Sequence, residues 1–319
     1  MVDLSVIIVN WNSKEYVRQC LTSLQLHCPG VASELVVVDG GSFDGCGEML
    51  AKEFPSVIFV QIDKNVGFAR ANNEAVRRSR GRNLLFLNPD TEFRENSLRI
   101  LRDKLETLPK VGAVGCKLLN SDGSLQTSCV QSFPTVINQV LDSDFLRGRF
   151  PGWHIWGTTA FQSDDRKPSE VETISGACIM MRRELFESIG GFTEDYFMYA
   201  EDVDLCLKIW RAGYRVYYTP ETSFVHFGGG SSAQARSNFS NIMMKESVYR
   251  FLSTHRGLPT ALTYRVAMAG SSMVRLLMIV ILLPFSRGGV VRHGSGSLRK
   301  WLSVLRWGLG MEPWAANIE

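Results

Sequence analysis

The feature that most constrains the fold of this chain is the alternation of short apolar runs with helical segments in its N-terminal third. Four runs rich in aliphatic and β-branched residues are typical of buried strands, and they cover residues 4–10, 34–39, 57–62 and 83–88. Between these runs, apolar residues recur at helical spacing over residues 14–26 and 67–79. Strands that alternate with helices predict βαβ units, and therefore an α/β fold around a mostly parallel sheet.

Polar residues follow each of these predicted strands. In an open parallel sheet, ligands bind at the carboxyl ends of the strands. The segments at those ends are rich in Asn, Asp, Ser and Gly, and they cover residues 10–13, 39–44, 63–67 and 88–90. Binding and catalytic side chains are therefore expected in these segments.

Beyond Lys110 the alternation becomes irregular. Strands are predicted over residues 111–119, 174–183 (leading into a short helix), 215–220 and 223–227, and a helix over 202–214. Residues 120–172 are rich in turn formers, and GGGSS at 228–232 predicts a flexible loop. From about Asn238 onward the chain is predicted to be helical.

Composition fits a globular enzyme. Hydrophobic residues make up 45% of the chain and charged residues 21%, and 319 residues suffice for one large α/β domain or two small ones. The net charge of +3 is too small to indicate nucleic acid, so no nucleic-acid partner is expected. The seven cysteines include no C-x-x-C pair, which favours reduced thiols in the cytosol over disulfides or zinc. No basic region precedes the first strand, so no signal peptide is expected.

Two glycine-containing loops are candidates for nucleotide binding. In VVVDGGSFDG (36–45), Asp39 can accept hydrogen bonds from a base or ribose, and the glycines permit close approach of the backbone. In DKNVGFARANN (63–73), a glycine precedes a helix whose N-terminus suits phosphate. The alternatives are a turn capped by Asp and an ordinary helix start. The chain lacks G-x-G-x-x-G after a strand, which argues against a dinucleotide oxidoreductase.

The segment LLFLNPDTEF (84–93) is the sharpest feature of the first half. A buried strand delivers Asn88 and Asp90 to the sheet edge, and Pro89 stiffens the turn between them. Hard divalent cations often combine one or two carboxylates with substrate phosphates, so Asp90 is a candidate ligand. An Asn-Pro-Asp turn is the alternative. His226, which ends a short strand before three glycines, is either structural or a contact for metal or phosphate.

The segment YFMYAEDVDLCLKIW (196–210) places three carboxylates among apolar residues, which is costly without compensation. The positive end of a helix dipole favours Glu201 at the helix start, and Asp204 can pair with Lys208 as a solvated ion pair. Asp202 lies at the border of the apolar stripe and is the acid these structural roles explain least, so it is a candidate general base. The stripe consists of Val203, Cys206, Leu207 and Trp210.

Six segments in this order resemble glycosyltransferase family 2, the inverting GT-A transferases that use nucleotide-sugar donors. They are SVIIVNWNS, VVVDGGSFDG, NVGFARANN, LLFLNPDT, SGACIMMRRELFESIGGFTEDYFMYAEDVDLCLK and VHFGGGS, and they fall within residues 3–235. Each segment alone is a weak signal, but the six in sequence are specific. NVGFARANN, LNPD and GGF…YFMYAEDVDL are most similar to the bacterial rhamnosyltransferases of polysaccharide assembly.

The resemblance implies a role for each matching residue. Asn88-Pro89-Asp90 matches the family's D-x-D motif, with Asp90 as a ligand of Mg²⁺ or Mn²⁺ and Asn88 in place of the first Asp. His226 matches a position that can add a second metal ligand. Asp202 matches the catalytic base, and Glu201 lies on the acceptor side. The nucleotide-sugar-binding residues would be Asn10, Asn12, Asp39, Gly67, Phe68, Asn72, Asn73 and Asn88, with DGGS in place of the more usual DNGS.

The resemblance also implies the reaction. A divalent cation neutralises the diphosphate leaving group, the base deprotonates an acceptor hydroxyl, and the attack inverts the anomeric carbon. We expect rhamnose from dTDP-rhamnose to be moved onto a saccharide or lipid-linked acceptor in cell-surface polysaccharide synthesis. The alternatives are a UDP-hexose or UDP-N-acetylhexosamine donor, or a catalytically silent nucleotide-sugar-binding protein of the same fold.

The C-terminal segment is basic and partly apolar. Residues 260–319 contain seven Lys or Arg and two Glu, a net charge of +5 against +3 for the whole chain. VAMAGSSMVRLLMIVILLPF (266–285) is 20 residues long, enough to span a bilayer, but Arg275 would cost roughly 2.5–3.5 kcal/mol there. Basic residues with Trp suit an anionic membrane surface. The segment is therefore an in-plane membrane helix, a packed helix or dimer contact, or a span.

Together these features predict a GT-A domain, Rossmann-like with a mostly parallel central sheet, over residues 1–235. Its halves would be a nucleotide-sugar-binding part (1–110) and an acceptor and catalytic part (111–235). A helical, basic extension would follow over residues 236–319. We expect a cytoplasmic enzyme in peripheral contact with the inner face of the cell membrane through residues 260–319.

Overall fold

The computed structural model describes residues 2–30, 33–143, 149–150, 153, 156, 167–228, 238–282 and 290–318. Of the loop predicted at 228–232, residues 229–232 lie outside the described residues, as do 283–285 of the apolar segment. The chain forms two compact units. The first comprises Met1–Phe133, Thr158–Phe197 and Glu201–Ser231, and the second Pro134–Gly157, Met198–Ala200 and Ser232–Glu319.

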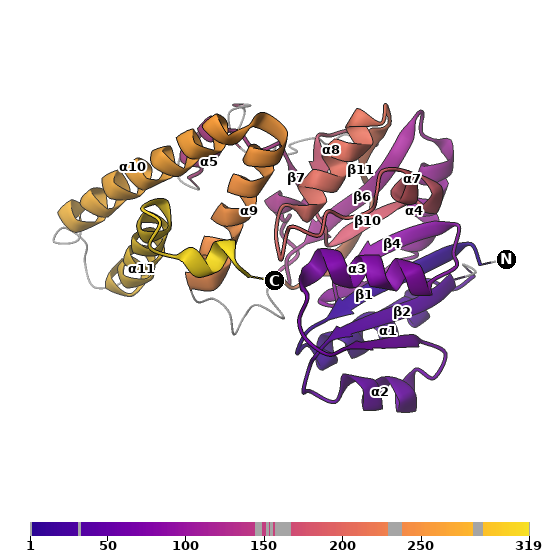
Figure 1. Ribbon diagram of the computed structural model, residues 1–319. Helices are drawn as coiled ribbons and strands as arrows, with labels where there is room; N and C mark the ends of the chain where they lie inside the picture. Colours follow the sequence, from indigo (N-terminus) through magenta and orange to yellow (C-terminus); the bar gives the residue numbers. More distant parts are fainter. Residues whose placement is uncertain are drawn as a thin grey trace. The chain divides into compact units, whose positions relative to one another are not determined.

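Within the described residues, the first unit contains a nine-stranded sheet in the order β3-β2-β1-β4-β10-β6-β11-β5, with β8 paired to β11 (Figure 1). Its strands are β1 (Leu4–Asn10), β2 (Ser33–Gly40), β3 (Ile58–Ile62), β4 (Asn83–Leu87), β5 (Thr91–Phe93), β6 (Val111–Leu119), β8 (Ser169–Glu170), β10 (Cys178–Arg182) and β11 (Arg215–His226). A separate pair joins β7 (Val130–Gln131) to β9 (Thr173–Ile174).

The four strands of the N-terminal third form a parallel block, as predicted. β1 pairs in parallel with β2 and β4, and β2 pairs in parallel with β3. Every residue of β4 is buried, which explains why its sequence is continuously apolar rather than alternating. The mostly parallel α/β fold expected from the sequence is therefore confirmed.

The second half of the sheet differs from the prediction in two places. β10 lies between β4 and β6 and pairs antiparallel with both. It therefore joins the parallel block β3-β2-β1-β4 to the parallel pair β6-β11. The two short strands predicted at 215–220 and 223–227 form one strand, β11, whose register against β6 shifts between Thr219 and Ser223. A bulge therefore accounts for the turn-like residues in the middle of β11.

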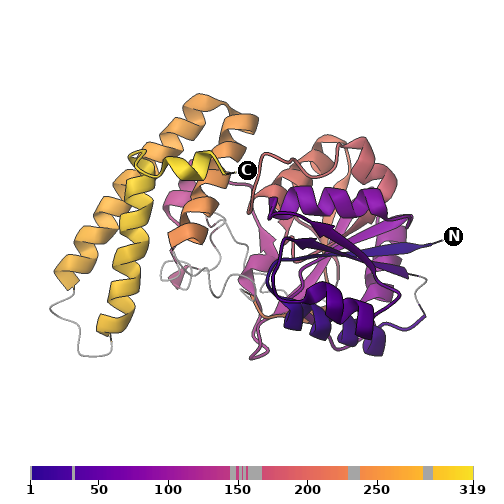
Figure 2. The same ribbon diagram turned by 60° about the horizontal axis from the view of Figure 1, so that its bottom comes forward.

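Helices cover both faces of the sheet, with α1 and α2 on one face and α3 on the other (Figure 2). Two of the helices, α2 and α4, were not predicted from the apolar spacing. Asn96 caps the N-terminus of α4 (Ser97–Thr107), because its Oδ1 accepts a hydrogen bond from the Arg99 N–H at 3.3 Å. The helices of this unit are α1 (Lys14–His27), α2 (Cys46–Glu53), α3 (Gly67–Arg78), α4 (Ser97–Thr107), α7 (Arg183–Ser188) and α8 (Glu201–Arg211), with a 3₁₀ turn η1 (Thr127–Cys129).

Gly67, the first residue of α3, is required by a close backbone approach. Its φ is +83°, and a Cβ at this position would lie 2.2 Å from the carbonyl oxygen of Phe197. That oxygen accepts the Phe68 N–H at 3.0 Å, so it cannot move away without loss of the hydrogen bond. Gly67 therefore ties α3 to the segment that leads toward α8.

We predict that Gly67→Ala lowers the free energy of unfolding by at least about 2 kcal/mol, because it adds a steric clash to an unfavourable φ. Gly123→Ala is the matched control, because Gly123 has a φ of +82° with no atom near its Cβ position. Urea denaturation of both variants measures the difference. Equal destabilisation of the two variants would show that the Phe197 contact contributes nothing.

The second unit is helical and has its own core. Its elements are α5 (Val136–Val140), α9 (Asn238–Arg256), α10 (Leu258–Leu282), α11 (Val290–Gly308) and the 3₁₀ turn η3 (Pro313–Ala316). Tyr264 and Trp307 are fully buried, and the Trp307 indole donates a 2.8 Å hydrogen bond to Glu246. This agrees with the helical character predicted from Asn238 onward.

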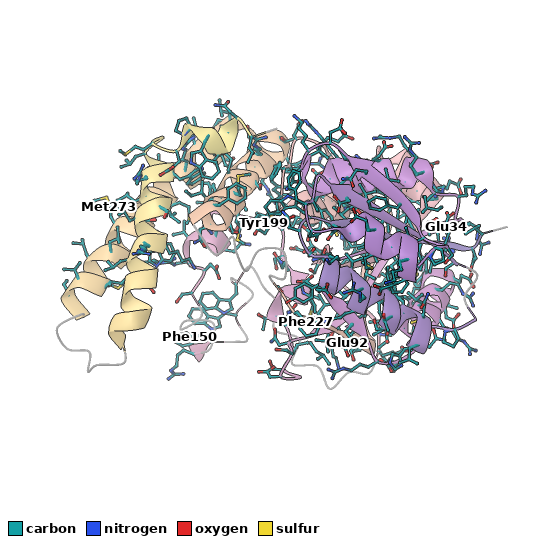
Figure 3. All side chains as sticks on the ribbon, turned by 90° about the horizontal axis from the view of Figure 1, so that it is seen from below. Glu34, Glu92, Phe150, Tyr199, Phe227 and Met273 are labelled. Carbon is teal, nitrogen blue, oxygen red and sulfur yellow. The ribbon has the colours of Figure 1, made fainter. Side chains whose placement is uncertain are left out.

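α10 is apolar on both its packed and its outer faces. One face buries Ala261, Tyr264 and Met268. The other exposes large apolar side chains, among them Met273, which is 53% exposed and points away from the neighbouring helices (Figure 3). By length and composition, the segment Leu258–Ile281 could cross a membrane, with a mean hydropathy of 1.5.

Candidate active site

The strand register brings the predicted site residues to one edge of the sheet. Asn10 ends β1 opposite Asp39 of β2, and Asn88 directly follows β4, the other neighbour of β1. His226 ends β11 opposite Thr91 of β5. The carboxyl ends of β1, β2 and β4 therefore carry the polar segments predicted from the sequence.

Asn10 and Asp39 form a buried pair. The Asn10 amide donates to Asp39 Oδ2 at 2.6 Å, and its Oδ1 accepts from Ser13 N and Oγ. Asp39 Oδ1 accepts from the Ser42 N–H at 2.7 Å and from Gln61 at 2.9 Å. Since Asn10 is fully buried, it orients the Asp39 carboxylate instead of presenting its own amide to solvent.

Asn12 shapes the loop that follows β2. It is exposed, has a φ of +50°, and its Oδ1 accepts the Phe43 N–H at 3.2 Å. Its own N–H donates to Ser42 Oγ at 2.8 Å. Asn12 thus joins the loop after β1 to the loop after β2 through Ser42, whose N–H donates to Asp39.

The residues predicted to line the donor from α3 also have structural contacts. The Asn72 amide donates to the Phe68 carbonyl at 2.9 Å, and the Phe68 ring packs edge-on against Phe192. Asn73 both donates to the Phe192 carbonyl and accepts from its N–H, at 2.9 and 3.1 Å. Together with Gly67, these residues fix the segment after α7 against α3.

Asp90 and His226 lie together although 136 positions separate them in the chain. The distance from His226 Nε2 to Asp90 Oδ1 is 3.2 Å, and the distance from Nε2 to Asn88 Nδ2 is also 3.2 Å. Asp90 is buried and His226 nearly so. The structure therefore brings together the two residues predicted as metal ligands, with Asn88 beside them.

Gln126 fixes the orientation of the His226 ring and was not predicted from the sequence. Its amide donates to the His226 backbone carbonyl at 2.8 Å, so its Oε1 faces His226 Nδ1, also at 2.8 Å. Nδ1 therefore carries a proton, and in the neutral ring Nε2 has a lone pair. That lone pair and the Asp90 carboxylate face each other across 3.2 Å.

A carboxylate and a ring lone pair at this distance favour a cation between them, either a proton on Nε2 or a divalent metal bound by both groups. In the neutral ring without a metal, the Asn88 amide, 3.2 Å from Nε2, is a donor available to the lone pair. The separation matches that of neighbouring ligands about 2.1 Å from an octahedral ion, which is about 3 Å. Among the described residues, no group of three or more His, Cys, Asp or Glu side chains is arranged around a metal position. Asp90 and His226 fit a metal that also takes oxygens from a bound diphosphate.

Asp202 is the second residue of α8. Its Oδ2 accepts the Gly176 N–H and its Oδ1 the Val203 N–H, each at 2.8 Å. The neighbour of Gly176, Ala177, accepts the Asn88 N–H at 3.2 Å, which places Asp202 at the same edge of the sheet as Asn88. Burial raises the pKa of the Asp202 carboxyl, while the backbone N–H groups oppose the rise.

Glu201, predicted as the acceptor-side acid, is buried, and its Oε2 has no hydrogen-bond partner among the described residues. Burial and, secondarily, the charge of Asp202 raise the pKa of Glu201 well above its ordinary value. The residues just before it, Tyr199 and Ala200, have φ values of 71° and 65°, which are strained for non-glycine residues. Nothing in the sequence pattern predicts this strain.

We predict that Glu201→Gln stabilises the protein by about 1–3 kcal/mol at about pH 8, because it removes a buried carboxyl group that resists ionisation and whose Oε2 has no partner among the described residues. The folded-state pKa lies above the unfolded value, so the charged form opposes folding at high pH and the cost disappears as pH falls. Thermal unfolding should therefore show a higher Tm for the variant at about pH 8 and no difference at about pH 4. An unchanged or lower Tm of the variant at about pH 8 would contradict the prediction that Glu201 destabilises the folded protein.

Asp204 differs from the prediction of a solvated acid. It is 1% exposed, and its Oδ2 accepts the Thr193 hydroxyl at 2.6 Å. Lys208 Nζ lies 3.5 Å from Asp204 Oδ2, so the predicted partner is right. The Asp204 side chain of this ion pair is buried, whereas the Lys208 side chain is partly exposed. The helix turns Asp204 inward because α8 buries Leu205, Cys206 and Ile209 on a face broader than the predicted stripe.

Two solved transferases share this architecture. A mannosyltransferase from Pyrobaculum calidifontis, solved with GDP-Man and Mn²⁺, aligns over 96% of this chain and 86% of its own with a TM-score of 0.56 and 17% identity. GalNAc-T7, solved with UDP, GalNAc and Mn²⁺, aligns over 70% of this chain and 43% of its own with a TM-score of 0.54 and 15% identity. The fold is thus the GT-A fold of glycosyltransferases.

The chain belongs to glycosyltransferase family 2, whose family model matches residues 5–190. A model described as the N-terminal domain of galactosyltransferase matches residues 158–242. The N-acetylglucosaminyl-diphospho-decaprenol L-rhamnosyltransferase of Mycobacterium tuberculosis is 29% identical over 87% of this chain and 92% of its own length. Rhamnosyltransferase WbbL of Escherichia coli is 28% identical over 60% of this chain and 71% of its own. The protein is a glycosyltransferase.

Proposed function

We propose that the protein is a metal-dependent inverting rhamnosyltransferase that moves rhamnose from dTDP-rhamnose onto a saccharide or lipid-linked acceptor in cell-surface polysaccharide synthesis. The observation that carries this proposal is the arrangement at the sheet edge. A carboxylate with a raised pKa, Asp202, shares that edge with the adjacent pair Asp90 and His226. The rhamnosyltransferases among its relatives favour the sugar.

In this proposal the nucleoside binds beside the first two strands. Asp39 accepts hydrogen bonds from the base, Asn10 holds its carboxylate in place, and Asn12 contributes from the exposed loop. The donor is lined by Gly67, Phe68, Asn72, Asn73 and Asn88. Because the side-chain amides of Asn72 and Asn73 already donate hydrogen bonds to backbone carbonyls, these residues act chiefly by shaping the donor-binding surface.

Asp90 and His226 are proposed to hold Mg²⁺ or Mn²⁺, with Gln126 keeping His226 Nε2 available. When bound, the cation supplies positive charge that stabilises the leaving diphosphate. Asn88 Nδ2 lies 3.2 Å from His226 Nε2, and we propose that its amide turns toward the diphosphate oxygens when the metal is bound.

Asp202 is proposed to take the proton from the acceptor hydroxyl, and Glu201 to lie against the acceptor. The Gly176 and Val203 N–H groups hold the carboxylate in one orientation, so its free lone pairs face the acceptor. The hydroxyl oxygen bonds to the anomeric carbon as the bond to the diphosphate breaks on the opposite face. Configuration inverts, and no covalent enzyme intermediate is required.

The alternatives within the fold are a UDP-hexose or UDP-N-acetylhexosamine donor, and a silent nucleotide-sugar-binding protein. A panel of nucleotide sugars, incubated with and without Mn²⁺, separates them by the nucleotide released. We expect release from dTDP-rhamnose that depends on the cation and on an acceptor. Nucleotide release from a UDP-sugar alone would identify that sugar nucleotide as the donor. Donor binding without nucleotide release from any sugar would support a silent nucleotide-sugar-binding protein.

We also propose that the protein works in the cytoplasm, in peripheral contact with the inner face of the membrane through residues 260–319. The outer face of α10 supports this, because its large apolar side chains include Leu262, Val266, Met273, Leu277 and Val280, each at least 47% exposed. Since the same helix packs its other face against protein, an in-plane position fits better than a span. A contact between two copies of the chain is the remaining alternative.

We predict that Met273→Glu together with Leu277→Glu abolishes flotation of the protein with anionic liposomes, because both charges would enter the apolar layer. Leu26→Glu is the control, because Leu26 is a comparably exposed residue on α1. Flotation that persists in the double variant would refute the contact. Loss of a dimer in the variant without any effect on flotation would favour the contact between copies.

A further inference from the structure

The second unit holds a group of three basic side chains from three helices. Lys245 of α9 is only 8% exposed, and it lies within electrostatic range of Arg275 of α10 and Lys300 of α11. Among the described residues, Lys245 forms no hydrogen bond or ion pair. Among the described residues, Asp142 is the carboxylate whose charge acts on this lysine, and Arg275 and Lys300 are the cations that do so.

Arg275 is held rigidly within this group. Its guanidinium donates to the backbone carbonyls of Val140 and Asp142 at 2.9 and 2.8 Å. Its Cζ lies 4.1 Å from the centre of the Trp301 ring, and Lys300 Nζ lies 5.3 Å from the same ring. Arg275 and Lys300 therefore both pack against the same indole ring, which keeps these two cations near each other.

The Lys245 side chain is only 8% exposed, and removing an ammonium group from water without a partner is costly. Burial is the main cause that lowers the pKa of Lys245 to about 8; the charge of Asp142 opposes this shift, and the charges of Lys300 and Arg275 add to it. A chain that needed only a packed core would place an apolar residue here. A bound anion with several oxygens would compensate all three cations at once.

We propose that Lys245, Arg275 and Lys300 form a binding site for the diphosphate group of an isoprenoid-linked acceptor. The proposal rests on the proposed function, from which it takes the lipid-linked acceptor. The apolar chain of such a lipid has a surface beside the site, because Val274 and Met278 flank Arg275 on α10 and are 56% and 48% exposed. A flat anionic bilayer is the poorer match, because Lys245 is buried and bulk headgroups would reach only exposed side chains.

The test measures equilibrium binding of radiolabelled farnesyl diphosphate to the full-length protein. We expect saturable binding that Lys245→Met and Lys300→Gln each weaken by at least about tenfold, the loss expected for a charge-assisted hydrogen bond. Arg299→Gln is the matched control, because Arg299 is an exposed neighbour on the same helix, and it should bind like the wild type. Lys300 is also exposed, so its variant reports on the site even if Lys245→Met fails to fold.

Competition by farnesol, inorganic pyrophosphate and phosphatidylglycerol vesicles identifies the source of the anion. Weak competition by all three supports the proposal. Pyrophosphate that competes as well as farnesyl diphosphate would overturn the lipid assignment, and so would vesicles whose binding depends equally on Lys245 and Lys300. Absent binding, or binding that neither variant changes, would overturn the site itself.

Binding of dTDP, measured on the same samples, separates this inference from the proposed function. If the protein transfers sugar but does not bind farnesyl diphosphate, the proposed diphosphate site is wrong and the proposed function stands. If it binds farnesyl diphosphate through Lys245 but transfers no sugar from any donor, the proposed function is wrong and the diphosphate site stands.

Discussion

Replacing Asp202 by Asn is expected to lower the rate of sugar transfer by about 10²–10⁴-fold, while nucleotide-sugar binding stays unchanged. Asparagine keeps the shape of the side chain and can still accept one of the two backbone N–H groups that orient it. It cannot take a proton from an acceptor hydroxyl. The loss should therefore appear in kcat and not in the dissociation constant of the donor.

The pH dependence gives this prediction a second readout. Burial raises the pKa of Asp202 above its ordinary value, and a base works only when deprotonated. Wild-type kcat/KM should therefore rise with pH through a midpoint above 3.8, the ordinary pKa of an aspartate, and this limb should vanish in Asp202→Asn. Glu184→Gln, at an exposed position on α7, is the control and should keep the wild-type profile. Transfer at the wild-type rate in Asp202→Asn would remove this residue as the base.

The first half of the fold could be predicted because its signals are local. β1 and β6 begin and end at the predicted residues, and β4 differs by one residue, because each is a continuous apolar run. α2 was missed because it has only eight residues, whereas α4 was missed although Leu98, Leu101 and Leu105 recur at helical spacing and are buried. The antiparallel place of β10 depends on pairing with strands more than sixty residues away, which no local pattern encodes.

The sequence pointed to Asp90 and His226 by residue type and by position at strand ends, with a turn and a structural role as the alternatives. Asp90 and His226 were found separately, and the fold brings them within 3.2 Å of each other. Gln126 was missed because it lies in the turn-rich region and acts through a side chain 100 positions away. Gly176 was missed for the same reason, since its N–H meets Asp202 only after β10 and α8 are in place. Their contributions arise from tertiary contacts and not from sequence motifs.

Replacing Asp90 by Asn is expected to abolish stimulation by Mn²⁺ and to lower transfer by about 10²–10³-fold. The variant keeps the shape of the turn but loses the negative charge that faces His226 Nε2 across 3.2 Å. Metal stabilisation of a leaving group is worth several kcal/mol, and each ~1.4 kcal/mol corresponds to a factor of ten. Electron paramagnetic resonance of Mn²⁺ titrated into the protein with dTDP measures the affinity directly.

Gln126→Leu provides the finer test, because Gln126 acts on the metal only through His226. Without its Oε1, the His226 ring can turn or protonate at Nε2, and Mn²⁺ affinity should fall by about 10–100-fold. Glu92→Gln is the matched control, because Glu92 lies two residues from Asp90 on β5 and pairs with Arg94 at 3.7 Å. If Asp90→Asn and Gln126→Leu bind Mn²⁺ as tightly as Glu92→Gln does, the 3.2 Å approach of Asp90 to His226 reflects a protonated imidazole and the metal binds elsewhere.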